Sequence, residues 1–239
     1  MNFALNPSLD RESLRAKFEL GGHIHIPHVL TEKSAKILHS CLSEDTPWNY
    51  VFNDGPKHYD LQPHQLEAMT ADQLHTIQQA INNGAQNGFQ YAFKNFPIYD
   101  LYQSGYLKDG VLKELFEFIN SEIFLSFIRD VSGISTIAYA DAQATAFEGG
   151  HFLSDHSDDV DGKNRRLAYV LNMTPDWLPD WGGLLNFYDD QGHVKRALKP
   201  TFNALNFFSV PQSHAVSMVT PFAGGVRRSI TGWLREGTN

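Results

Sequence analysis

The sequence predicts an α+β fold that is mainly β, with a helical N-terminal layer over residues 1–134 and an all-β sandwich or barrel over residues 135–239. From Ser135 onward the chain carries seven short β-rich runs, separated by clusters of Gly, Pro, Asp and Asn. No helical pattern connects these runs, so a parallel α/β sheet is not expected. The chain has 239 residues, 42 % of them hydrophobic, and no repeat or linker divides it. We therefore expect a single domain, 1–239, with one sizeable core.

The first predicted elements of the N-terminal layer are a strand and two helices. Residues 23–30, HIHIPHVL, alternate as a strand does. Thr31 follows as the expected N-cap of a helix whose apolar face includes Cys41. Thr70 and Gln73 have the spacing of a capping box and predict the start of a second helix.

The next predicted element is the apolar helical segment 111–133, VLKELFEFINSEIFLSFIRDVSG. It is so apolar that we expect it to pack directly on a sheet, with Gly133 as its terminator. The seven β-rich runs that follow are TIAYADAQATAF, RRLAYVLNM, GLLNFYD, HVKRALK, FNALNFFSV, SHAVSMV and RRSITGWL. Antiparallel strands of this length and number are typical of two sheets folded together.

Composition excludes several classes of function. The 19 Lys and Arg are outnumbered by 27 Asp and Glu, for a net charge of −8, so a general nucleic-acid binder is not expected. The single cysteine allows neither an internal disulfide nor a cysteine-based zinc cage. Any metal would have to be held by imidazole and carboxylate, and 11 histidines are present. Without an apolar span or a signal-like start, we expect no membrane association and a cytoplasmic location.

His156-Ser157-Asp158 is the first candidate metal-binding motif. The H-x-D form places two side chains on one side of an extended strand, because strand side chains alternate with period two. The form is common by chance, and the second copy, His58-Tyr59-Asp60, is interpreted as a loop or hairpin pair. Context favours the first copy, because it leads directly into a series of further motifs. These are Asn172, Gly182-Gly183, His214 and Arg227-Arg228-Ser229-Ile230-Thr231-Gly232-Trp233.

Together with His214, this motif would supply two histidines and one carboxylate, a set that leaves three coordination positions of Fe(II) open. Open positions are what oxygen chemistry needs. Arg227 follows after enough residues for a turn and a return on the neighbouring antiparallel strand. Its guanidinium can then bind a dicarboxylate bidentately, with the Ser229 hydroxyl on the same strand face.

The order of these motifs resembles the Fe(II)/2-oxoglutarate-dependent dioxygenases, and within them the prolyl 4-hydroxylase-like branch, over about residues 135–235. The resemblance implies a double-stranded β-helix, the cupin-like jelly roll, for residues 135–239, with the helical layer packed on one sheet. It implies that Fe(II) is bound by His156, Asp158 and His214. It also implies that Arg227 binds the C5 carboxylate of 2-oxoglutarate, helped by Ser229 or Thr231.

Two positions depart from the pattern of this family. Many relatives carry a tyrosine where this chain has Phe147, and many read Y-L-N where Val170 begins V-L-N. Both departures remove a phenol that would contact the cosubstrate. Tyr139, Gln143 and Tyr169 are candidates to replace these contacts.

The function implied by the resemblance is hydroxylation of a C–H bond, with 2-oxoglutarate and O2 as cosubstrates and release of succinate and CO2; ascorbate is a further cofactor that the family allows. Asp158 favours hydroxylation, because halogenating relatives lack the carboxylate. The expected substrate is a prolyl or similar residue in a protein or peptide. Two alternatives are a hydroxylase of a free amino acid or other small molecule, and a non-catalytic jelly-roll module that binds a metal or a sugar.

The remaining candidates are peripheral to this set. The aromatic segment 47–55 is interpreted as a lid or substrate rim, together with the acidic residues of 155–161, and an acidic rim favours basic or zwitterionic partners. His151 should face away from His156, because five residues separate them on a strand. The histidines of 23–28 are interpreted as a partly exposed strand.

Overall fold

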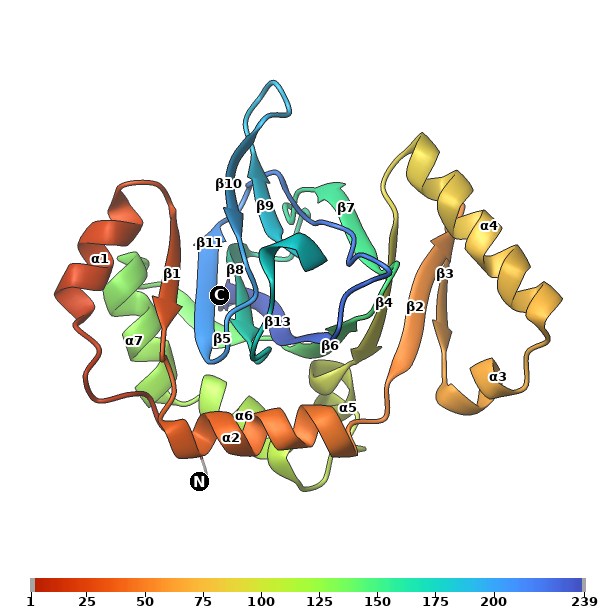
Figure 1. Ribbon diagram of the computed structural model, residues 1–239. Helices are drawn as coiled ribbons and strands as arrows, with labels where there is room; N and C mark the ends of the chain where they lie inside the picture. Colours follow the sequence, from red (N-terminus) through yellow and green to blue (C-terminus); the bar gives the residue numbers. More distant parts are fainter. Residues whose placement is uncertain (1–2, 238–239) are drawn as a thin grey trace.

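The computed structural model of the protein describes residues 3–237, in which α-helices are confined to the first 132 residues and antiparallel strands dominate the rest (Figure 1). The helices in this range are α1 (Arg11–Glu19), α2 (Glu32–Ser40), α3 (Pro63–Glu67), α4 (Ala71–Asn87), α5 (Ile98–Gln103), α6 (Val111–Ile119) and α7 (Glu122–Ser132). Among the described residues, no helix combines the length and the apolar character that crossing a membrane requires.

The strands form an almost closed barrel in which every pair is antiparallel. They are β1 (His23–Pro27), β2 (Asn49–Asp54), β3 (Lys57–Leu61), β4 (Tyr91–Phe96), β5 (Ile137–Ala140), β6 (Gln143–Phe147), β7 (Phe152–His156), β8 (Arg165–Asn172), β9 (Leu185–Tyr188), β10 (Val194–Leu198), β11 (Ala204–Ser209), β12 (His214–Val216) and β13 (Arg227–Glu236). The expected mainly β, jelly-roll class is confirmed.

Two walls of the barrel face each other. The order along the sheet is β1-β11-β8-β13-β6-β4-β7-β12-β9-β10. We call β1, β11, β8, β13 and β6 the major wall, and β7, β12, β9 and β10 the minor wall. The strand β4 joins them, because Lys94, Asn95 and Phe96 pair with β6 whereas Tyr91 and Ala92 pair with β7.

The helical layer covers the outer face of the major wall. Strand β8 shows the division, since its side chains alternate between two buried clusters. Leu167, Tyr169 and Leu171 lie in the large cluster that also contains the apolar faces of α1, α2, α6 and α7. Ala168 and Val170 lie in a separate cluster inside the barrel. The helices therefore stabilise this wall from outside and leave its inner face free for a site.

The local signals in the sequence set three helix ends as expected. The Thr31 hydroxyl accepts a hydrogen bond from the backbone N–H of Ser34 at the start of α2. Thr70 and Gln73 form a capping box at the start of α4. Gly133 ends α7 with a φ of 73°, a left-handed conformation that glycine adopts without a steric penalty.

The expected continuous helical segment 111–133 is wrong in one respect, because the structure divides it into α6 and α7. Asn120 stands at the break. Its side chain accepts a hydrogen bond from the Ala140 N–H and donates to the Ala140 carbonyl. These bonds fasten the break to the edge strand β5 and let each helix present its own apolar face.

The sequence interpretation did not locate β2, β3 and β4. These strands form an antiparallel extension beside the barrel, and α4 lies along it (Figure 1). One face of the extension packs on α4, where Ile81 meets Phe52 and Ala92 in a buried cluster. The other face is turned to the barrel mouth. The pair His58-Tyr59-Asp60 lies on β3 of this hairpin, as expected.

Candidate metal and cosubstrate site

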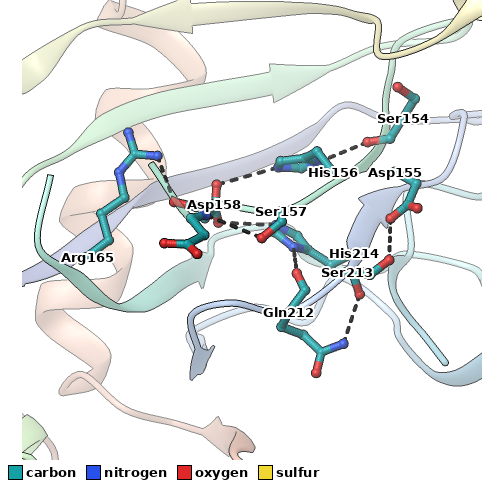
Figure 2. Close-up of polar contacts among 10 residues, drawn as sticks. Ser154, Asp155, His156, Ser157, Asp158, Arg165, Gln212, Ser213 and His214 are labelled. Carbon is teal, nitrogen blue, oxygen red and sulfur yellow. Dashed lines mark hydrogen bonds and ion pairs between the residues drawn. The ribbon is translucent and has the colours of Figure 1, made fainter. Parts of the chain in front are cut away.

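The three predicted metal ligands lie together on the minor wall. His156 ends β7 and pairs in register with His214 of β12, and Asp158 follows two residues after β7 ends. Asp158 Oδ1 lies 3.6 Å from His156 Nε2, and Asp158 Oδ2 lies 3.4 Å from His214 Nε2. Figure 2 shows the two imidazoles directed toward the carboxylate.

Hydrogen bonds orient both imidazoles for metal binding. His156 Nδ1 lies 2.9 Å from the Ser154 carbonyl oxygen, and His214 Nδ1 lies 2.8 Å from the Gln212 carbonyl oxygen (Figure 2). Because a carbonyl only accepts, each Nδ1 carries the proton and donates it. Each Nε2 then carries a free lone pair directed at the same point, which is the arrangement that ligating histidines adopt.

The donor set fits Fe(II). Two nitrogens and one carboxylate oxygen, all within 4.8 Å of one another, can bind one ion at about 2.0–2.2 Å each and leave its other face open. Among residues 3–237, this is the one group of three or more His, Cys, Asp or Glu side chains whose ligand atoms lie this close together. Burial, followed by the nearby His156, lowers the pKa of His214. The lowered pKa favours the neutral imidazole, which is the ligating form.

Arg227 faces the same cavity from the major wall. From the sequence we expected Arg227 on a strand next to that of His214, and this expectation is wrong. Arg227 lies on β13, between β6 and β8, whereas His214 lies on β12, between β7 and β9. A jelly roll returns the chain to the opposite wall instead. Arg227 therefore approaches the metal site across the barrel, which leaves room between them for a small molecule.

The Arg227 guanidinium is a buried cation without a counter-charge. It is 1 % exposed, and neither its Nε nor one of its terminal nitrogens has a hydrogen-bond partner. Its nearest aromatic neighbour is the Phe147 ring, 4.9 Å from the guanidinium carbon. Burial lowers its pKa to about 10, so the group still carries its charge at neutral pH. A buried, unpaired guanidinium is costly unless an anion joins it, and a carboxylate matches its geometry.

The Gly182-Gly183 pair has a structural reason next to this cation. Gly183 has a φ of 63°, and a Cβ there would lie 3.0 Å from Arg227 Cδ and 3.1 Å from Val219 Cγ2. At Gly182, a Cβ would collide with the Met218 carbonyl oxygen. Two glycines let this loop pass close enough to pack against the arginine stem.

The other predicted cosubstrate residues divide into two groups. Thr231 and Gln143 line the inner cavity with the metal group and Arg227. Ser229 is buried beside them, and its hydroxyl lies 3.0 Å from the hydroxyl of Thr145, which lines the cavity.

The two tyrosines contribute no hydroxyl to this group: Tyr169 borders the inner cavity, but its hydroxyl is bound outside it, and Tyr139 lies away from it. The Tyr169 ring packs in the cluster under the helices, and its hydroxyl donates to the Asp141 carbonyl at 2.8 Å. Tyr139 lies on β5 beside Arg235 and lines neither the inner cavity nor the wider cavity next to it. Phe147 and Val170, the two departures from the family pattern, both line the inner cavity, so their apolar side chains replace phenols where the cosubstrate would bind.

A wider outer cavity opens from the metal group toward the surface. The inner cavity has a volume of about 80 Å³ and the outer one about 540 Å³. His156, Asp158, Phe93, Leu153, Gln143 and Trp233 line both. The metal position therefore lies between a small chamber that ends at Arg227 and a large one that can admit a substrate.

Arg165 and Trp233 are residues of the outer cavity that sequence reasoning missed as site residues. The Arg165 guanidinium stacks on the Trp233 ring, with its carbon 3.4 Å from the ring centroid. It also donates to the backbone carbonyl of Asp158 at 3.1 Å (Figure 2). No motif spacing links residues on β8 and β13, so only the strand pairing could have revealed the contact.

Of the candidates outside the metal and cosubstrate set, which are segment 47–55, the acidic residues of 155–161 and His151, only some lie near the metal group. In segment 47–55, Val51 lines the outer cavity, and the segment is strand β2 and not a free lid. Of the acidic residues in 155–161, Asp155 accepts a hydrogen bond from the Ser213 hydroxyl (Figure 2). His151 is not part of the metal group: its ring lies 5.3 Å from the Tyr50 ring, and its Nδ1 accepts a hydrogen bond from the Glu148 N–H.

Known proteins resemble this chain in sequence. Residues 142–235 match the family described as the 2OG-Fe(II) oxygenase superfamily. Over 120 residues the chain is 36 % identical to the prolyl 3-hydroxylase OGFOD1 of Mus musculus, covering 47 % of this chain and 22 % of that protein. The Xenopus laevis prolyl 3-hydroxylase OGFOD1 is 32 % identical over 120 residues, covering 47 % of this chain and 23 % of its own length. The match thus spans less than a quarter of these curated relatives.

Solved structures resemble it in fold. A Pseudomonas putida prolyl-4-hydroxylase superposes with a TM-score of 0.57 at 15 % identity, covering 96 % of this chain and all of that one. An oxidoreductase of the 2OG-Fe(II) oxygenase family from Burkholderia pseudomallei gives a TM-score of 0.60 at 13 % identity, covering 99 % of this chain and 96 % of that one. The predicted resemblance to the 2OG-Fe(II) oxygenases is confirmed over residues 142–235, and the solved structures confirm the fold.

Proposed function

We propose that this protein hydroxylates a prolyl or similar residue of a protein or peptide, using Fe(II) and 2-oxoglutarate, because residues 142–235 match the 2OG-Fe(II) oxygenase superfamily. The observation that carries the proposal is Arg227: a buried, unpaired guanidinium in the same small cavity as a two-histidine, one-carboxylate group. A dicarboxylate that binds the cation at one end reaches the metal position with the other.

Each part of the cavity has a role in the proposed reaction. His156, Asp158 and His214 would hold Fe(II), which when bound supplies the redox chemistry with O2. Arg227 fixes the distal carboxylate of 2-oxoglutarate through charge-assisted hydrogen bonds. Thr231 lines the same chamber and offers a hydroxyl to that carboxylate. In the overall reaction one oxygen atom of O2 enters succinate, with loss of CO2, and the other enters the C–H bond of the substrate.

The apolar lining of the inner cavity protects this chemistry from water. Phe147, Phe208 and Val216 surround the site, and the Phe208 ring lies edge-on against His214, with centroids 4.6 Å apart. A dry chamber strengthens the attraction between Arg227 and a carboxylate.

The proline specificity is supported by the curated relatives, which are named prolyl 3-hydroxylases. The wide outer cavity supports a substrate larger than a free amino acid. A hydroxylase of free amino acids or other small molecules is the alternative, and the non-catalytic jelly-roll module is a more distant one.

The test measures succinate formed from 2-oxoglutarate by the purified protein with Fe(II), in the presence of proline-containing peptides, proteins of a cell lysate, or its metabolites. We expect succinate formation that a chelator abolishes, together with a mass gain of one oxygen atom on a peptide or protein. Fragmentation and NMR of the product then assign the hydroxyl to C3 or C4. A mass gain confined to metabolites would refute the protein substrate, and absence of metal-dependent turnover with every pool would refute the enzyme.

A further inference from the structure

The outer cavity continues into a second groove that the proposed reaction does not use. This groove has a volume of about 620 Å³ and shares four lining residues with the outer cavity: His58, Asn95, Gln143 and Trp233. Its other lining residues include Asp60, Asp100, Asp141 and Arg235. A path therefore leads from the metal position, through the outer cavity, to the protein surface beside the β2–β3 hairpin.

The floor of this path is the inner face of β3, β2, β4 and β6. Strand alternation directs Phe52 and Tyr59 toward α4, and His58 and Asp60 toward the groove. On β4, the same alternation directs Phe93 and Asn95 into the cavities. Barrel side chains cover this face at Val51 and Phe93, whereas at His58 and Asp60 on β3 it is exposed. An exposed part of a sheet face next to a candidate active site is a surface on which an extended segment can lie.

An unpaired amide group lies at the junction. Asn95 is 9 % exposed, and its Oδ1 has no hydrogen-bond partner. Its Nδ2 donates to Gln143 Oε1 at 3.5 Å, and the Nε2 of Gln143 has no hydrogen-bond partner among residues 3–237. The pair thus leaves one acceptor and one donor beside the path. A peptide unit carries one N–H donor and one C=O acceptor, so it satisfies both groups at once.

The lining of this groove outside the junction has an acidic bias. Asp141 is paired with Arg235, whereas neither Asp60 nor Asp100 forms an ion pair within the described residues. Lys163 is the remaining cation in the lining. Two free carboxylates against one ammonium favour a basic side chain over an acidic one.

We propose that the substrate is an extended polypeptide, in which the residues on one side of the hydroxylated position leave along this groove, with Asn95 and Gln143 bound to a backbone peptide unit and Asp60 and Asp100 facing a basic side chain. The inference rests on the proposed prolyl hydroxylation and specifies its substrate class. It makes Asn95 and Gln143 specificity-determining residues for chain length, and it excludes free amino acids as the preferred substrate.

The first test compares peptides of one sequence that are shortened stepwise from either end around a central proline. Removal of the flank that lies in the groove should lower kcat/KM by about tenfold, since it forfeits a buried hydrogen-bonded peptide unit and a charge contact. Removal of the other flank should cost much less. If the wild-type protein hydroxylates the longest and shortest peptides equally well, the groove inference falls and the hydroxylase proposal stands. If it hydroxylates none, the proposed function itself fails.

The second test assigns the length dependence to Asn95. In Asn95→Leu, which keeps the shape of the side chain, the ratio of kcat/KM for the long and short peptides should fall by about threefold to tenfold. The matched control is Asn83→Leu on the exposed face of α4, which should keep the wild-type ratio. Binding of the fluorescent long peptide, followed by anisotropy without O2, should weaken for Asn95→Leu alone. An unchanged ratio in a folded Asn95→Leu protein would overturn the role of this amide.

The third test uses charge reversal at an exposed residue, where folding is not at risk. Asp60→Lys should shift the preference from peptides with a lysine in the groove flank to peptides with a glutamate there, by about twofold to fivefold at low salt and less at high salt. An identical preference in wild type and Asp60→Lys would overturn the charge part of the inference.

Discussion

The inner and outer ends of the cavity differ in where their residues come from. The inner chamber is built by β6–β9 and β11–β13, with Phe93 of β4 as one further lining residue. Its metal group and arginine lie within residues 142–235, the part of the chain that matches the oxygenase superfamily. The outer cavity and its groove depend on Val51, His58, Phe89 and Asn95, which precede that match. In the proposed function the jelly roll therefore supplies the chemistry, and the N-terminal extension, which comprises β2, β3 and β4, supplies part of the surface that meets the substrate.

The largest expected effect is at the metal group. His156→Ala removes one of two imidazoles that share a carboxylate, and we expect succinate formation to fall by at least about 100-fold. Iron retained after gel filtration, measured by atomic absorption, should fall as well. The matched control is His75→Ala on the exposed face of α4, which should keep both activity and iron. Full activity in His156→Ala would exclude this group as the metal site.

The next effect separates binding from stability at Arg227. Arg227→Met removes an unpaired buried cation, so the free protein should become more stable by about 1–4 kcal/mol, measured by urea unfolding. The same change should raise the KM for 2-oxoglutarate by about 30-fold or more, because the distal carboxylate loses its partner. Added 2-oxoglutarate should raise the melting temperature of the wild type much more than that of the variant. A variant that is less stable and binds 2-oxoglutarate normally would assign Arg227 to the core.

A smaller effect tests the loop that supports the arginine. Gly183→Ala adds a Cβ 3.0 Å from Arg227 Cδ at a φ of 63°, so both backbone strain and overpacking destabilise it. The control Gly192→Ala has a φ of 81° with nothing within 4 Å of its Cβ, and therefore carries backbone strain alone. The free energy of unfolding should fall further in Gly183→Ala than in Gly192→Ala, by about 1–3 kcal/mol. Equal losses would show that the loop is free to move away from Arg227.

Sequence reasoning succeeded where chemistry follows from spacing along one strand or from ordered motifs. The H-x-D pair and the helix caps at Thr31 and Thr70 depend on contacts within a few residues, so local patterns reveal them. His214 and Arg227 were found through the order of the family's motifs. Their placement on opposite walls was not, because the path of a jelly roll between strands is set by the whole sheet and not by the length of the connecting loop.

The outer cavity could not be predicted either, because it depends on contacts between strands that are distant in the sequence. Strand β4 has buried residues on both faces, so it lacks the clean alternation that marks a half-exposed strand. Its pairing with both β6 and β7 is a contact between distant parts of the chain. The stack of Arg165 on Trp233 likewise exists only because β8 and β13 are neighbours.

The smallest expected effect, that of Phe89→Ala, tests whether the inner and outer cavities act separately. Phe89 is 52 % exposed, and its ring lies 5.5 Å from the His156 ring at the edge of the outer cavity. Phe89→Ala removes part of that wall without touching the inner chamber, so the KM for a peptide should rise by about twofold to fivefold while the KM for 2-oxoglutarate stays the same. Phe222→Ala, an exposed phenylalanine outside the cavity, is the control and should change neither. If Phe89→Ala altered the KM for 2-oxoglutarate as strongly as the KM for the peptide, the two chambers would act as one, and the N-terminal extension would share in the chemistry that the jelly roll is proposed to perform alone.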